Sequence, residues 1–229
     1  TGIGTIDSTG SVNTDAGFSI VSYSGNSTAG ATIAHGLGAT PKMMIVRKRN
    51  SAENWLVYHA STGNTGATLL NGTNAFFQDD MWNSTSPTSS VFTVHGGAGA
   101  NASGGTYIAY CFTDVKGYSK FSSYIGNGNA DGAFVYTGFK SAFVMIKKTS
   151  GTGNWCLFDN KRGVNGAMIQ LNPDVNNADN TSNYIDFLSN GFKCRNTASD
   201  KNASGGSYIY MAFAENPFVT STGVPATAR

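Results

Sequence analysis

The sequence predicts an all-β protein: an antiparallel β-sandwich, jelly-roll or concanavalin-like, that is internally duplicated with a pseudo-two-fold repeat. The first observation is the repeat, because residues 101–107 (NASGGTY) return as residues 202–208 (NASGGSY). A period this long indicates a duplicated domain-sized unit rather than a solenoid. The second is composition: β-branched and aromatic residues are plentiful and Glu occurs only at Glu53 and Glu215, which favours strands over helices. The third is the series of short apolar runs between Gly- and Asn-bearing turns, which is typical of sandwiches.

The repeat boundaries divide the chain into four parts. Residues 1–16 lack periodicity and are expected to form an N-terminal arm or linker, and residues 216–229 are expected to form a C-terminal tail. Repeat 1 spans residues 17–116 and repeat 2 spans residues 117–215. The junction contains no linker of useful length, which predicts that the repeats pack together. Two arrangements fit: two small sandwiches that share an interface, or one larger sandwich.

In repeat 1, an apolar strand is expected from Phe18 to the turn at residues 25–26. The apolar run at residues 43–46 predicts a strand buried on both faces within residues 42–49. A turn then makes residues 55–59 the return strand of a hairpin. Further strands are expected at residues 68–70, 91–94 and 106–113, with an irregular stretch at residues 71–90.

Repeat 2 follows the same order. It contains one run, residues 184–188, that has no match in repeat 1. Trp55 and Trp155 occupy matching positions, and this recurrence predicts core packing in both repeats. The expected strands are residues 118–125, 134–136, 142–148, 155–158, 168–171, 184–188, 192–195 and 207–214.

Charge and cysteine content exclude several classes of function. The net charge of +2 is too small to predict a nucleic-acid partner, and no apolar run approaches the roughly 20 residues of a membrane span. The three cysteines, Cys111, Cys156 and Cys194, show neither a disulfide framework nor zinc-type spacing. Cys111 and Cys156 lie in apolar strand patterns and are expected to be buried thiols.

No catalytic residue, metal site or cofactor is predicted, and the chain is expected not to be an enzyme. His35, His59 and His95 lack metal-ligand spacing and are expected in polar turns or at a rim. The Gly-x-Ser-x-Gly elbow of a serine hydrolase is absent. Asp79 and Asp80 point to opposite faces if extended, which is wrong for a glycosidase pair. If the segment is a loop, binding of a divalent cation by their carboxylate oxygens is the alternative.

One aromatic cluster is a candidate ligand surface. Trp82 has no Trp counterpart in repeat 2 and lies beside aromatic and acidic residues. Aromatic faces with polar neighbours suit sugar rings or a protein partner, and burial under the long loop is the alternative. The candidate ligand-binding residues are Trp82, Phe77, Asp79, Asp80 and His59.

Three strings resemble a domain of tail-fibre and other virion surface proteins of tailed bacteriophages, especially marine ones. They are residues 35–43 (HGLGATPKM), 82–92 (WNSTSPTSSVF) and 101–107, and residues 214–218 (AENPF) and 225–229 (PATAR) are similar to that domain's C-terminal end. The resemblance covers residues 17–229. It implies a structural protein on the extracellular virion surface, with other virion proteins and a host-cell glycan as partners. Trimeric assembly is implied by analogy only.

Three hypotheses for function follow. The first is a non-enzymatic virion surface module, in a tail fibre or capsid decoration, that attaches to the host surface. The second is an extracellular carbohydrate-binding, lectin-like module. The third is a polysaccharide depolymerase, which the scarcity of paired acids makes the weakest.

Overall fold

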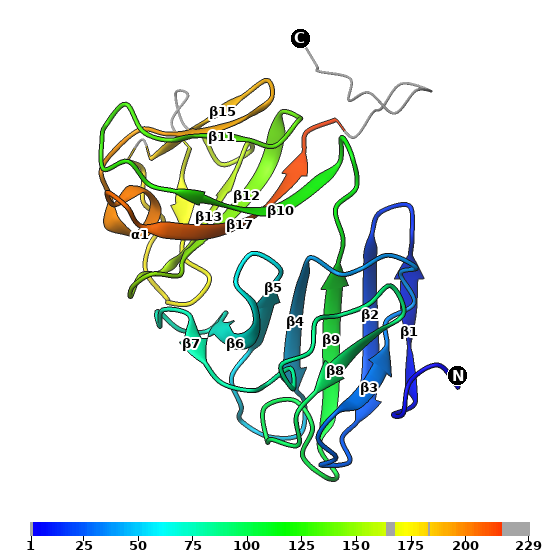
Figure 1. Ribbon diagram of the computed structural model, residues 1–229. Coiled ribbons are helices and arrows are strands. Elements are labelled where there is room, and N and C mark those ends of the chain that lie inside the picture. The colour runs from blue at the N-terminus through cyan, green and yellow to red at the C-terminus, as the bar shows by residue number, and fades with distance from the viewer. Residues whose placement is uncertain (1, 164–167, 183, 217–229) are drawn as a thin grey trace. The chain divides into compact units, whose positions relative to one another are not determined.

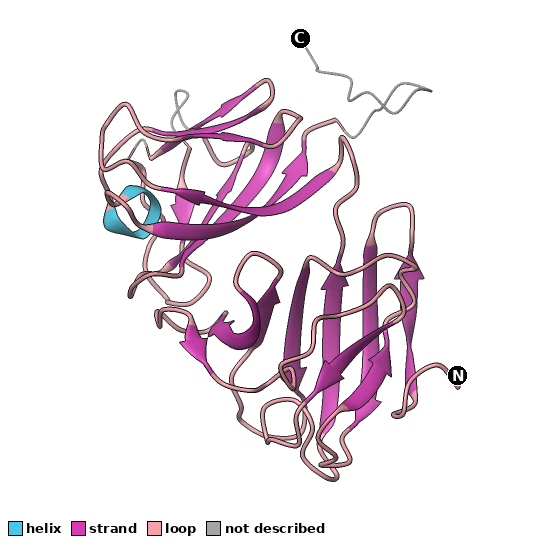
Figure 2. Ribbon diagram, viewed as in Figure 1, coloured by secondary structure: helices cyan, strands magenta, loops and turns pink. Residues whose placement is uncertain are grey.

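The computed structural model describes residues 2–163, 168–182 and 184–216, and these form a nearly all-β protein (Figure 2). Each strand pair with a defined register is antiparallel. The predicted all-β, antiparallel sandwich class is therefore confirmed, and internal duplication stays a prediction. The elements are β1 (Ser8–Asn13), β2 (Phe18–Ser24), β3 (Ala31–Ala34), β4 (Met43–Lys48), β5 (Leu56–His59), β6 (Gly63–Leu69), β7 (Phe77–Gln78), β8 (Val91–Val94), β9 (Thr106–Phe112), β10 (Ser119–Ile125), β11 (Phe134–Tyr136), β12 (Ser141–Lys148), β13 (Trp155–Asp159), β14 (Gln170–Leu171), β15 (Ile185–Leu188), β16 (Gly191–Cys194), α1 (Ser199–Asn202) and β17 (Ser207–Ala214).

The chain divides into two compact units close to the predicted boundary. Unit 1 comprises Thr1–Asn71 and Phe76–Asp114, and unit 2 comprises Gly72–Ala75 and Val115–Arg229. The short insertion of residues 72–75 into unit 2 was not predicted. The predicted tail, apart from Asn216, lies outside the described residues.

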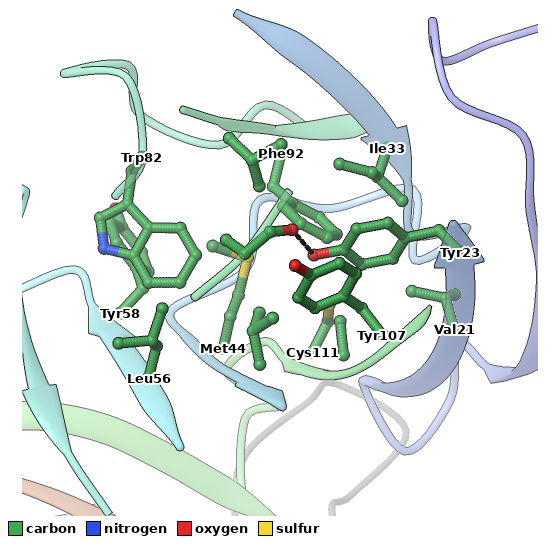
Figure 3. Packing of buried hydrophobic residues seen from close by; sticks show 14 of the residues in the cluster. Val21, Tyr23, Ile33, Met44, Leu56, Tyr58, Trp82, Phe92, Tyr107 and Cys111 are labelled. Atoms are coloured by element: carbon green, nitrogen blue, oxygen red, sulfur yellow. Dashed lines mark hydrogen bonds between the residues drawn. The ribbon is translucent and has the colours of Figure 1, made fainter. Parts of the chain in front are cut away.

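Unit 1 is a two-layer sandwich. Its larger sheet has the order β1-β2-β9-β4-β5-β6-β7, and the β3–β8 pair lies across it (Figure 1). Val21, Met44 and Tyr107 from the larger sheet pack with Ile33 and Phe92 from the pair (Figure 3). All four residues 43–46 are buried, as their unbroken apolar run predicts, because β4 lies between β9 and β5 inside the sheet.

The prediction that residues 1–16 form an arm or linker is wrong for most of that segment. β1 pairs with β2 along its whole length, from Ser8 opposite Tyr23 to Asn13 opposite Phe18, and Ile6 is buried. In β1 only Ser8 is buried, because the strand lies at the sheet edge. An exposed edge strand needs no apolar alternation, so the sequence carries no strand pattern there.

Unit 2 is also a two-layer sandwich. A sheet of order β10-β17-β12-β13-β14 faces a smaller sheet of order β11-β16-β15. Val144, Phe158 and Tyr210 from the larger sheet pack with Ile185 and Phe192 from the smaller one. The run without a match in repeat 1 is thus an added strand, β15. Each unit has a hydrophobic core of its own.

The two units share strand order and an interior motif. The order β2-β9-β4-β5-β6 in unit 1 corresponds to β10-β17-β12-β13-β14 in unit 2. Tyr23 stacks on Tyr107 with ring centroids 5.1 Å apart, and Tyr124 stacks on Tyr208 at 5.0 Å. Three hydrogen bonds of 2.7–2.9 Å to backbone carbonyls also match. In unit 1, Tyr23 donates to Ala100, Tyr107 to Ala98 and Asn101 to Thr28. In unit 2, Tyr124 donates to Lys201, Tyr208 to Ser199 and Asn202 to Asn129.

We call this motif the tyrosine–asparagine corner: Tyr23, Tyr107 and Asn101 in unit 1, and Tyr124, Tyr208 and Asn202 in unit 2. It explains why the NASGGTY string recurs, because the string supplies the buried Asn and the Tyr of each corner. The corner is a structural feature, and descent of the units from one duplicated ancestor stays a prediction.

The matching tryptophans differ in depth. Trp155 is 1% exposed, as core packing predicts, whereas Trp55 is partly buried and stacks on Tyr110 at a centroid distance of 6.4 Å. A cation lies over each ring, Arg47 at 5.8 Å and Lys147 at 6.0 Å. The basic strand ends are therefore partly occupied in cation–π contacts.

Candidate functional sites

Trp82 belongs to the core of unit 1, so its predicted role as an exposed ligand platform is wrong. Its side chain is 0% exposed. The indole Nε1 donates a 2.9 Å hydrogen bond to the carbonyl of Gly66, and the ring meets Tyr58 edge-on (Figure 3). The irregular loop therefore folds its largest aromatic residue inward, where burial of the indole stabilises a segment that has little regular structure.

The other four candidate residues do not form one site with an exposed aromatic face. His59 is buried in β5, where its Nδ1 accepts a 3.1 Å hydrogen bond from the backbone of Ser61. Phe77 is partly buried in β7, and both aspartates are exposed. Ser84 donates a 2.9 Å hydrogen bond to Asp80. Two of the five candidates are thus interior and two are surface carboxylates.

The histidines correct a second prediction. His35 is 0% exposed; its Nε2 lies 3.2 Å from the carbonyl of Thr88, and its Nδ1 accepts from the backbone of Leu37. Burial lowers the pKa of His35 below its usual value. His35 and His59 are therefore interior residues, and only His95 is exposed as expected. Within the described residues, no three His, Cys, Asp or Glu side chains gather to hold a metal ion.

A polar hollow lies on unit 1. It has a volume of about 400 Å³ and contains a carboxylate, Asp7, a guanidinium, Arg49, and several hydroxyl groups. The sequence does not indicate this hollow, because residues 7 and 9 lie in the segment without strand periodicity that is expected to form an arm. Its lining is Ile6, Asp7, Thr9, Ser22, Tyr23, Ser24, Arg49, Thr106 and Tyr107.

Unit 2 contains a buried polar cluster around Lys201, which is 1% exposed. Its Nζ donates 2.7 Å hydrogen bonds to Oε1 of Gln170 and to Oδ1 of Asp200. The same nitrogen lies 3.9 Å from the centroid of the Tyr184 ring and 3.8 Å from Sγ of Cys156. The amine is thus held between a carboxamide, a carboxylate, an aromatic face and a thiol.

The neighbours of Lys201 are themselves fixed. Gln170 is buried, and its Nε2 donates a 3.2 Å hydrogen bond to Oδ1 of Asn172, whose own Nδ2 donates to the carbonyl of Trp155 at 2.8 Å. The thiol of Cys156 donates a 3.2 Å hydrogen bond to Oδ2 of Asp200. Burial raises the pKa of Cys156 above the usual thiol range, so the neutral thiol is present at neutral pH.

A second buried lysine in unit 2 has a different environment. Lys147 donates hydrogen bonds to the backbone carbonyls of Gly153, at 2.5 Å, and Gly72, at 3.3 Å. Burial lowers its pKa to about 8. Lys147 thus donates to backbone carbonyls, whereas Lys201 donates to a carboxamide and a carboxylate side chain.

The three cysteines are buried and free, which confirms the expectation for Cys111 and Cys156. Burial raises the pKa of Cys111 to about 12 and that of Cys194 to about 11. These thiols are therefore protonated and weakly reactive at neutral pH.

Unit 1 has apolar residues where unit 2 has the Lys201 cluster. Directly before the repeated string, Gly99 and Ala100 stand where Asp200 and Lys201 stand in unit 2, and after the matching tryptophans Leu56 stands where Cys156 does. A Cβ placed on Gly99 lies 2.9 Å from Leu56 Cδ1, so these positions also pack together in unit 1. In the sequence, the cluster is marked by ionisable residues in repeat 2 at positions where repeat 1 has apolar residues or glycine.

Comparison with known protein families matches residues 1–217 of the chain to a family model. The chain belongs to the family described as Domain of unknown function (DUF7483). Searches of curated proteins and of solved structures find no match. The jelly-roll or concanavalin-like assignment and the resemblance to phage proteins therefore stay predictions. No helix in the described part of the chain is long and apolar enough to cross a membrane.

Proposed function

We propose that this DUF7483 protein is a non-enzymatic virion surface module, in a tail fibre or capsid decoration, that contacts glycans of the host cell. Copies of the chain form a homo-oligomer, and this oligomer contacts other virion proteins. The observation that carries the glycan contact is the polar hollow of unit 1. The virion role is supported by the strings that resemble phage surface proteins.

The chemistry of the hollow suits a polyhydroxyl ligand. Asp7 supplies acceptor oxygens, Arg49 supplies a planar set of donors, and Thr9 and Ser24 supply hydroxyl groups that act as both. Sugars present hydroxyl groups of the same double character, so hydrogen bonds in both directions are available. Asp7, Thr9, Ser24 and Arg49 are exposed, which leaves their polar atoms in reach of a ligand at the surface.

Binding of the full chain to an array of bacterial surface glycans tests the ligand. Arg49→Ala removes the guanidinium from the hollow, and we expect its affinity to fall about tenfold or more, since a hydrogen bond to a charged group contributes about 1.5–3 kcal/mol. Arg195→Ala is the matched control, because Arg195 is an exposed arginine on unit 2 that pairs with Asp186. Equal binding by Arg49→Ala and the unsubstituted chain would contradict the assignment of the hollow.

Location and assembly need a separate measurement. An antibody against the chain is expected to label purified virions in electron micrographs, and light scattering is expected to give a defined oligomer. Virions without label would contradict the virion role. A strict monomer that binds a monosaccharide tightly would favour a lectin-like module instead.

A further inference from the structure

We propose that Lys201 and Gln170 react within the folded chain to form an amide cross-link between their side chains, with Asp200 as the proton carrier and ammonia as the leaving group. This modification site is independent of the proposed function. It rests on the geometry of the buried cluster in unit 2.

The reacting atoms are already neighbours. Nζ of Lys201 lies 2.7 Å from Oε1 of Gln170, and a carbonyl carbon lies about 1.23 Å from its oxygen, so Cδ of Gln170 is within about 4 Å of the amine. Reacting atoms in a productive arrangement are about 3–3.5 Å apart. Rotation of the carboxamide about the Cγ–Cδ bond turns the face of its carbonyl carbon toward the amine, and a small shift of the lysine side chain closes the remaining distance.

The reaction needs a neutral amine, and Asp200 lies where it can accept a proton from Nζ. Lys201 is 1% exposed and Gln170 is 4% exposed, and Nζ sits over the face of Tyr184. Transfer of one proton from Nζ to the carboxylate, across their 2.7 Å hydrogen bond, replaces the ion pair with a neutral amine and a neutral acid.

The step balances without an added reactant. The lone pair of Nζ attacks Cδ of Gln170, a C–N bond forms, and the carbonyl π electrons move to Oε1. The tetrahedral adduct collapses, the bond from Cδ to Nε2 breaks, and Asp200 carries protons from Nζ to the departing nitrogen. The products are a Lys201–Gln170 amide, an ammonium ion and the regenerated carboxylate of Asp200.

The neighbouring residues orient this reaction and disfavour its competitor. Asn172 accepts a hydrogen bond from Nε2 of Gln170, which fixes the direction of the leaving nitrogen. Cys156 is a second nucleophile in the cluster, with Sγ 3.8 Å from Nζ of Lys201, and its attack on Gln170 would give a thioester with the same loss of ammonia. The Cys156 thiol is protonated, however, and donates to Asp200, so it is the weaker nucleophile.

The intact mass of the folded full chain tests the proposal. We expect a mass lower by one ammonia than the sequence requires, and a digest in which one linked peptide contains both Gln170 and Lys201. Trypsin is expected not to cut after Lys201. An unmodified mass after prolonged incubation of the folded chain would overturn the proposal.

Variants assign the bond. Lys201→Met is expected to restore the full mass, and Asp200→Asn to slow formation at least tenfold. The matched control is Lys147→Met, which removes the other buried lysine and is expected to retain the cross-link. Cys156→Ala is also expected to retain it, and a linkage to Cys156 that hydroxylamine cleaves would overturn the proposal.

A second variant guards against misfolding of Lys201→Met. Gln170→Glu keeps the lysine and aspartate, and a bond formed in it releases water in place of ammonia. Loss of ammonia from Gln170→Glu, or loss mapped to an asparagine such as Asn127 before Gly128, would show that the mass change arises elsewhere and would overturn the proposal.

Discussion

Units 1 and 2 share a strand order and the tyrosine–asparagine corner but differ in the residues that pack beside the corner. Both have the stacked tyrosine pair, the buried asparagine and the same order of five strands. At matching positions, unit 1 places Ala100 in an apolar cluster, whereas unit 2 places Lys201 in a polar one. The comparison teaches that the corner and the strand order occur together in both units, while positions beside the corner differ in chemistry.

The difference between the units is expected to be largest when the lysine is moved into unit 1. Ala100→Lys places an unpaired charge at a site that is 1% exposed and lined by apolar residues. We expect a loss of about 4 kcal/mol or more in the free energy of unfolding, measured with denaturant, because no carboxylate or carboxamide replaces the lost hydration.

Ala98→Lys is the control for that substitution. Ala98 is exposed on the same turn, so a lysine there is expected to change the free energy of unfolding by no more than about 0.5 kcal/mol. Equal stability of Ala100→Lys and Ala98→Lys would break the comparison, because it would mean that unit 1 accepts the chemistry of unit 2 without cost.

Removal of the corner asparagine is expected to have an effect of intermediate size on the free energy of unfolding. Asn101→Ala removes a buried carboxamide that bonds two backbone groups, and Asn202→Ala removes one that bonds three. Each is expected to cost its own unit about 2–3 kcal/mol, because a backbone donor and at least one backbone acceptor lose their partners. Hydrogen exchange in β9 and β17 measures the two units separately.

Asn50→Ala serves as the matched control, because Asn50 also bonds two backbone groups but is exposed. Water replaces its partners, so the expected cost is about 1 kcal/mol or less. A large cost for Asn101→Ala with none for Asn202→Ala would mean that the corner does not support the two units alike.

The smallest predicted effect is the pH dependence that His35 gives to unit 1. Burial lowers the pKa of His35 in the folded chain, so the unfolded chain binds the proton more readily. Stability contributed by neutral His35 is therefore complete above the unfolded pKa of about 6.5 and is lost as the pH falls below it. The slope is at most about 1.4 kcal/mol per pH unit for one proton.

Denaturant unfolding between pH 7.5 and pH 5 measures this slope, and His35→Gln is expected to reduce it. His95→Gln, at an exposed position, is expected to leave it unchanged. An identical slope for the chain and His35→Gln would assign the pH dependence to other groups.

The regular strands could be predicted from the sequence because their side chains carry the pattern of burial. β8, β11 and β17 have the predicted bounds, since each alternates or runs apolar between clear turns. β1 could not be predicted, because five of its six residues face solvent. β3 is short and contains two alanines, which gives a weak strand signal.

The candidate site was harder to predict for a different reason. The sequence does not show which way the loop turns the ring of Trp82. In the structure the ring points into the core of unit 1. The Lys201 cluster joins β13, β14 and α1, and its contacts span up to 45 residues of chain. Such a cluster depends on tertiary packing, so only the exchange between the repeats marks it in advance.

A crystal structure of the full chain tests the central claim most directly, because it allows residues 17–114 to be superposed on residues 117–214. The account predicts that the five matched strands of each unit superpose and that both corners have stacked tyrosines about one buried asparagine. Units that do not superpose, or a corner present in only one of them, would contradict it.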